Sequence, residues 1–290
     1  MPTRLSLRLR ALLLTVLVLS SLSACSRIDL AYRNLDVLVP WSLNDYLDMD
    51  REQKRWLDQR LHQHLAWHCQ TQLPGYLHWL DRVRTMVAQN AVTDAALRQR
   101  TEEAREAIGR VAEAITPSAT ELLAGLSDAQ VGELREAFAK DIRERRAEYV
   151  DTPLAQQIDE RAERMEKRLK PWLGALSPAQ HQRVVQWSQA LGDQNRAWIT
   201  NRAEWQQQLL SAVEQRQTPG FAARMAQLLQ HKDSLWTPAY RQAFEQTETQ
   251  ARSLMVDLLQ DSSPEQRQRL QDRLDKVRQD FSALKCLKEA

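Results

Sequence analysis

The sequence predicts an all-α fold, an irregular multi-helix bundle of about nine or ten helices and not a regular solenoid. Three observations support this prediction. Glycine is scarce, with 7 residues in a chain of 290, so the many tight turns of an all-β fold are not available. Apolar residues recur at helical spacing, and hydroxyl residues stand directly before prolines at several positions.

The first 24 residues have the pattern of a secretory signal. Three arginines precede an apolar run from Ala11 to Leu19, which is shorter than the ~20 residues that a membrane-spanning helix needs. The stretch Leu22-Ser23-Ala24-Cys25 follows it and resembles a bacterial lipoprotein lipobox. This resemblance implies cleavage before Cys25, a diacylglyceryl group on its thiol, and a fatty acyl chain such as palmitate on the new amine.

The lipobox also carries an expectation about location. Ser26, rather than Asp, follows Cys25, which by resemblance to enterobacterial sorting favours a lipid anchor in the outer membrane, facing the periplasm. Two alternatives are an ordinary secreted protein with an incidental cysteine and an uncleaved anchor. Trp41 lies near the anchor, and its side chain is suited to the headgroup level of a membrane.

The predicted organisation is a signal peptide over residues 1–24, a lipidated N-terminal segment over 25–41 and an all-helical domain over 42–290. The signal contains three arginines and no acidic residue, so its removal leaves 37 basic residues against 38 acidic ones. The mature protein therefore lacks the basic excess typical of nucleic-acid binding, and no nucleic acid is expected as a partner.

The helices can be placed in order along the domain. Asp50 can cap a helix that runs to about Gln70 and carries a stripe formed by Leu57, Leu61 and Leu65. Apolar residues at helical spacing mark two further helices, one with Tyr76, Leu77, Leu80, Val83 and Val87 and the next with Leu97, Ala104, Ile108 and Val111. Later helix starts are predicted where a hydroxyl residue precedes proline: Thr116-Pro117, Thr152-Pro153, Ser177-Pro178, Thr218-Pro219, Thr237-Pro238 and Ser263-Pro264.

Four of the helix starts share a capping-box pattern, a cap residue followed three positions later by glutamine. The caps are Asp50, Ser127, Ser177 and Ser263, and the glutamines are Gln53, Gln130, Gln180 and Gln266. The glutamine side chain can reach back to the amide of the cap residue. Their irregular spacing does not support a helical array. Repeated capping chemistry explains the pattern, and the alternative is a divergent duplication of a helical hairpin.

Few side chains suggest a catalytic, metal-binding or redox role. His64 and His68 are four residues apart on one predicted helix face, a spacing that can hold a metal ion, but hydrogen-bonded histidines at the edge of the core are the simpler interpretation. Cys69 and Cys286 are the two cysteines left after lipidation, and in an oxidising envelope they form a disulfide or remain free thiols. No motif for nucleophilic or metal-dependent hydrolysis is present, so neither an enzyme nor a cofactor is expected.

The chain resembles an uncharacterised family of proteobacterial lipoproteins. The resemblance is carried by residues 30–36, Pro40-Trp41, Asp45-Tyr46, residues 50–53 and Leu73-Pro74, and it extends through residues 161–180. It implies location and helical character and assigns no active site. A fainter resemblance connects Leu126, Ser127 and Gln130, and Leu176, Ser177 and Gln180, to the L-T-x-x-Q motifs of periplasmic stress chaperones and metal-responsive sensors, with serine here in place of threonine.

These observations predict a binding or structural role. We expect an outer-membrane lipoprotein, held by its diacylglyceryl anchor, that engages another envelope protein through a helical groove. A chaperone-like activity is the sharpest form of this expectation. The alternative is a metal-responsive envelope sensor or carrier that uses His64 and His68.

Overall fold

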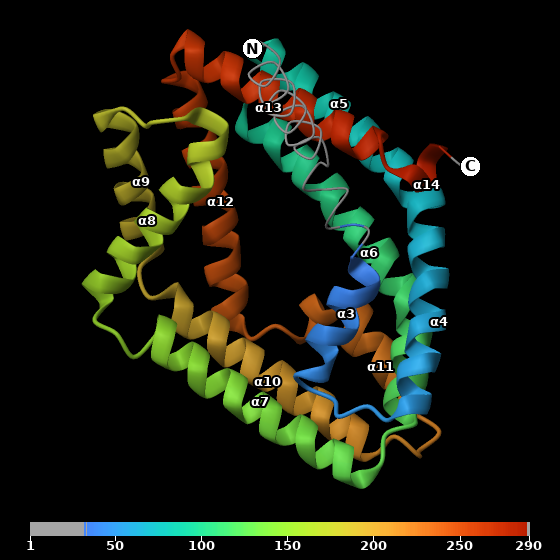
Figure 1. Ribbon diagram of the computed structural model, residues 1–290. Coiled ribbons are helices and arrows are strands. Elements are labelled where there is room, and N and C mark those ends of the chain that lie inside the picture. Colours follow the sequence, from blue (N-terminus) through green and yellow to red (C-terminus); the bar gives the residue numbers. More distant parts are fainter. Residues whose placement is uncertain (1–31, 33, 289–290) are drawn as a thin grey trace, which may run out of the picture.

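The computed structural model describes residue 32 and residues 34–288, and in this part of the chain all regular structure is helical (Figure 1). The all-α prediction is confirmed. The α-helices are α3 (Leu35–Asn44), α4 (Arg51–Trp67), α5 (Leu73–Ala88), α6 (Asp94–Ala124), α7 (Asp128–Tyr149), α8 (Leu154–Leu173), α9 (Pro178–Leu191), α10 (Gln194–Glu214), α11 (Phe221–Gln230), α12 (Pro238–Gln260), α13 (Pro264–Ser282) and α14 (Lys285–Lys288).

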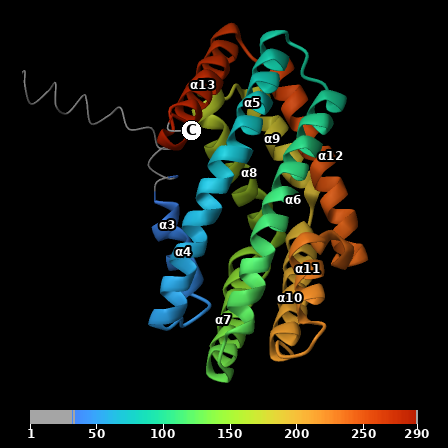
Figure 2. The same ribbon diagram turned by 90° about the vertical axis from the view of Figure 1, so that its right-hand side faces the viewer.

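Most helices lie in pairs along the outline of an irregular quadrilateral (Figure 1). The pairs are α5 with α13, α8 with α9, α7 with α10 and α6 with α11, while α12 packs against α9 and α10. A π-helical turn, η1 (His68–Gln72), joins α4 to α5 without a loop. Helices α5 and α6 then form a hairpin, whose turn contains Asn90 with φ 53° (Figure 2).

The helix starts predicted where a hydroxyl residue precedes proline are partly correct. Ser177, Thr237 and Ser263 cap α9, α12 and α13 as predicted. Helices α8 and α11 begin one and two residues after their prolines, at Leu154 and Phe221. The prediction at Thr116-Pro117 is wrong, because the Thr116 hydroxyl donates to the carbonyl of Ala112 at 2.6 Å and α6 continues through Pro117.

All four predicted capping boxes are present, and the structure joins them in two pairs. In the first pair, Gln53 at the start of α4 meets Gln130 at the start of α7, and each side-chain amide donates to the other's oxygen, at 3.1 and 2.7 Å. In the second pair, Gln180 of α9 and Gln266 of α13 exchange the same two bonds, both at 3.0 Å. We call these the first and second glutamine clasps.

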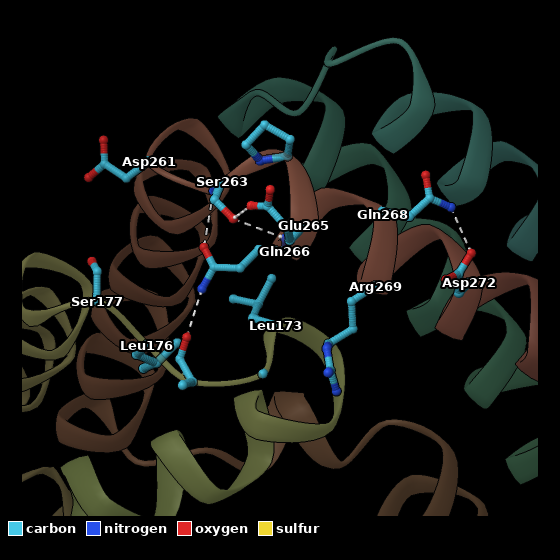
Figure 3. A pocket seen from close by; sticks show the side chains of 13 residues that line it. Leu173, Leu176, Ser177, Asp261, Ser263, Glu265, Gln266, Gln268, Arg269 and Asp272 are labelled. Atoms are coloured by element: carbon cyan, nitrogen blue, oxygen red, sulfur yellow. Dashed lines mark hydrogen bonds between the residues drawn. The ribbon is translucent and has the colours of Figure 1, made fainter.

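Each clasp satisfies its carboxamides completely. In the second clasp, the Gln266 oxygen accepts from the Ser263 backbone amide, and the Gln266 nitrogen also donates to the Ala175 carbonyl at 3.0 Å (Figure 3). Gln180 accepts likewise from Ser177 and donates to the Leu258 carbonyl. A glutamine side chain has two donors and two acceptor positions, and all of them are used here.

Each clasp lies beside a separate hydrophobic core. The first core combines buried residues of α6, α7, α10 and α11 with Leu47 and Met49. The second combines buried residues of α8, α9, α12 and α13, and Val83 and Val87 of α5 pack against it. A small third cluster is formed by Cys69, Leu73 and Leu284. The interior is therefore divided rather than continuous.

Two further features concern the membrane and the domain boundary. No described helix is both long and apolar enough to cross a bilayer. The predicted boundary between residues 41 and 42 falls inside α3, because regular helix already begins at Leu35. Leu43 of α3 packs against the first core, so this helix belongs to the folded body.

Candidate functional site

A groove between α5 and α6 has a mostly apolar lining. It has a volume of about 1220 Å³. The α5 side contributes Tyr76, Trp79, Leu80 and Met86, and the α6 side contributes Ala96, Ala104, Ala107 and Ile108, with Phe281 at one end. The lining runs from Gly75 to Gln89 along α5, which at 1.5 Å per residue is about 21 Å.

Polar bridges connect the two walls of the groove. The Trp79 indole donates to the Arg100 carbonyl at 2.9 Å, and Arg82 of α5 pairs with Glu103 of α6 at 2.9 Å. Within α6, Arg100 also pairs with Glu103, at 2.9 Å. The contacts of Trp79 and Arg82 connect the two helices across the groove.

Ile108 is the most prominent apolar group of this groove. It belongs to the stripe that marks α6 in the sequence, yet 65% of its surface is exposed. The neighbouring Ala107 is 9% exposed. Periodicity identifies the apolar face of a helix but cannot show whether that face meets the core or solvent, and for this reason a helical groove was expected but its position was not predicted.

His64 and His68 are both engaged in hydrogen bonds. The His64 Nε2 atom lies 2.8 Å from the Ser118 hydroxyl. The His68 ring lies between two tyrosines, with Nδ1 3.2 Å from the Tyr32 hydroxyl and Nε2 3.2 Å from the Tyr76 hydroxyl. The Tyr32 hydroxyl also donates to the Leu65 carbonyl, which makes His68 Nδ1 the donor to Tyr32.

Burial controls the protonation of this cluster. It lowers the pKa of His68, and burial followed by the charge of Arg60 lowers the pKa of His64. Burial and then the proximity of Tyr76 raise the pKa of Tyr32 to about 12. In the described part of the chain, no three or more His, Cys, Asp or Glu side chains are grouped to hold a metal ion. The metal hypothesis for His64 and His68 therefore has no third ligand among these residues.

Cys69 and Cys286 are joined by a disulfide across a sequence separation of 217 residues. Cys69 lies in the π-helical turn and is 1% exposed, and Cys286 lies in α14. The bridge therefore fixes the C-terminal helix to the junction of α4 and α5, next to His68. Cys25, the predicted lipidation site, lies outside the described residues.

A second hollow, of about 1030 Å³, lies beside the second clasp (Figure 3). Its walls are the 173–177 turn and residues 261–272. Three of the polar side chains that line it already have partners: Gln266 is part of the clasp, the Ser263 hydroxyl donates to Glu265, and Gln268 donates to Asp272 (Figure 3). The α5–α6 groove is therefore the better candidate for binding.

The disulfide should contribute strongly to stability. We expect Cys286→Ser to lower the free energy of unfolding by about 5 kcal/mol, because the bridge restricts a very long loop of the unfolded chain. Urea denaturation measures this loss. In the double variant Cys69→Ser, Cys286→Ser, the missing bridge should lower the free energy of unfolding no further than in either single variant, because the same bridge is lost in all three. Two alkylatable thiols in the unreduced acylated protein would contradict the assignment.

The buried His68 should make stability depend on pH. Its pKa is lower in the folded protein than in the unfolded chain, so the unfolded chain binds the proton more readily. The contribution of neutral His68 to the free energy of unfolding is complete above about pH 6.5, the usual pKa of histidine, and it is lost as the pH falls through the lower pKa of the folded protein. Relative to His68→Gln, the wild type should therefore lose stability between pH 7.5 and 5. A difference that stays constant with pH would refute the burial of a neutral imidazole.

Comparisons with known proteins give a family without a described activity. No curated protein and no solved structure matches the chain. One family profile, described as a family of unknown function (DUF6279), matches residues 45–241. This range includes the α5 and α6 walls of the groove, Cys69 and both glutamines of the first clasp, whereas Gln266, Phe281 and Cys286 lie beyond it. Because the match covers well over half of the chain, the protein belongs to this family of unknown function.

Proposed function

We propose that the protein is a lipid-anchored envelope protein that binds an amphipathic helix of another protein in the α5–α6 groove. The anchor is the diacylglyceryl group expected on Cys25, and the location is the periplasmic face of the outer membrane. The observation that carries the binding role is the apolar groove with Ile108 exposed in it. No catalytic role is proposed for any residue.

The division of the interior explains why this groove stays open. Val83 and Val87 of α5 pack against the second core, while Leu122 near the end of α6 packs in the first. Helix α5 and the C-terminal end of α6 therefore pack in different cores, whereas the start of α6 is joined to α12 by the ion pairs of Asp94 with Arg252 and Arg105 with Glu248. An uncovered apolar groove between two rigid helices is a common form of protein-binding site.

The lining favours a helix as the bound element. Ala96, Ala104 and Ala107 are small positions of the α6 wall, beside longer polar side chains such as Arg100 and Glu106, and a third helix approaches most closely at such small residues. Met86 on the opposite wall is flexible and adapts to different side chains. The length of about 21 Å accommodates roughly four turns of helix. Apolar side chains at positions i, i+3 or i+4 and i+7 of a partner would meet this surface.

The proposal can be tested by site-specific photocrosslinking in cells. A photoreactive amino acid at Ala104 should capture a partner in the anchored protein, and Ile108→Asp should reduce this capture at least ~tenfold, since a buried isoleucine contributes about 1.5–3 kcal/mol. The exposed Leu154 on α8 provides a matched position outside the groove. Mass spectrometry identifies the captured segment.

The identity of the crosslinked proteins distinguishes two forms of the proposal, a dedicated partner and a chaperone-like activity. Crosslinks to one amphipathic helix support a dedicated partner, and crosslinks to many unrelated unfolded chains support the chaperone-like form. Equal capture from Leu154, or capture from Ala104 that Ile108→Asp leaves unchanged, would refute the groove as the binding site. Circular dichroism must show that the variant retains its helices.

A further inference from the structure

Helix α3 presents an uncharged apolar face to the exterior. Val37 is 63% exposed, Leu38 45% and Trp41 67%. The positions i, i+1 and i+4 place these three side chains on one side of the helix. The opposite side is attached to the body through Leu43, which packs against the first core. Figure 2 shows α3 at the edge of the molecule, beside α4.

Trp41 differs from the other tryptophans of the chain. All nine lie within the described residues, and the other eight are buried or half-buried. A tryptophan that exposes two thirds of its surface next to exposed valine and leucine is unusual for a protein face that meets only water. Its indole is the side chain most often found at the headgroup level of membranes.

The start of the folded body is fixed very close to Cys25. Tyr32 is bound to His68 and to the Leu65 carbonyl, which fastens this residue to the end of α4. Cys25 precedes Tyr32 by seven residues. Even a fully extended chain of this length spans only about 25 Å. If Cys25 is acylated, the surface around Tyr32 must therefore stay near the bilayer, and α3 begins three residues after Tyr32.

We propose that the Val37–Leu38–Trp41 face of α3 rests in the headgroup region of the phospholipid bilayer. This inference depends on the proposed anchoring at Cys25 and adds an orientation to it. The anchor already holds α3 at the surface, so three apolar side chains suffice to keep the helix inserted without binding a membrane on their own. The lipid chains and the α3 face together define which side of the protein faces the membrane.

The test uses the acylated full chain in vesicles of phosphatidylethanolamine and phosphatidylglycerol with brominated acyl chains. Bromine quenches tryptophan emission at short range. We expect quenching in the wild type, its loss in Trp41→Phe, and no change in the control Trp172→Phe, which alters a half-buried tryptophan of α8. A Val37→Ser, Leu38→Ser double variant keeps Trp41 and should show quenching reduced severalfold.

Two results would contradict two different proposals, the bilayer contact of α3 and the acylation of Cys25. Acylation of Cys25, shown by the mass of its N-terminal peptide, together with quenching that is absent or unaffected by Trp41→Phe, would refute the bilayer contact of α3 and leave the anchor intact. An unmodified Cys25 in protein isolated from its native membranes would refute the proposed anchoring, and with it the basis of this inference.

Discussion

The two glutamine clasps are the interactions on which the arrangement of the helices depends. Each clasp brings the N-terminus of one helix against the N-terminus of another that lies 77 or 86 residues away in the sequence. Two helix N-termini carry partial positive charges and repel each other, so a close approach needs oxygen acceptors between them. The glutamine oxygens supply these, and acidic residues in the first turns, Glu52, Asp128 and Glu265, add to the effect.

The clasps and the disulfide together account for the open groove. Each clasp organises its own core, and the disulfide fixes the C-terminus to the π-helical turn that precedes α5. Helix α5 is thereby tied to α13, while α6 is tied to α11. Helix α6 also contacts α12, and polar bridges such as Arg82–Glu103 connect α5 and α6 across the groove. A surface suited to a partner helix is thus a consequence of how the interior is divided.

Local chemistry could be predicted from the sequence, and long-range pairing could not. The helical class and the four capping boxes depend on a few neighbouring residues, and both are confirmed. The pairing of Gln180 with Gln266 depends on where two helices meet in space, 86 residues apart in the sequence. Thr116-Pro117 shows the limit of a local rule, because surrounding helix overrides it. The exposure of Ile108 depends on which helices pack around α6, which periodicity does not encode.

The most direct test of this account is a double-mutant cycle on the free energy of unfolding, measured by urea denaturation. Gln180→Ala and Gln266→Ala remove partners of one clasp, whereas Gln53→Ala and Gln266→Ala remove groups of different clasps. We expect a coupling energy of about 0.5–3 kcal/mol for the first pair and additivity within about 0.5 kcal/mol for the second. Additive losses for Gln180 and Gln266 would contradict it, because the four capping boxes would then act independently.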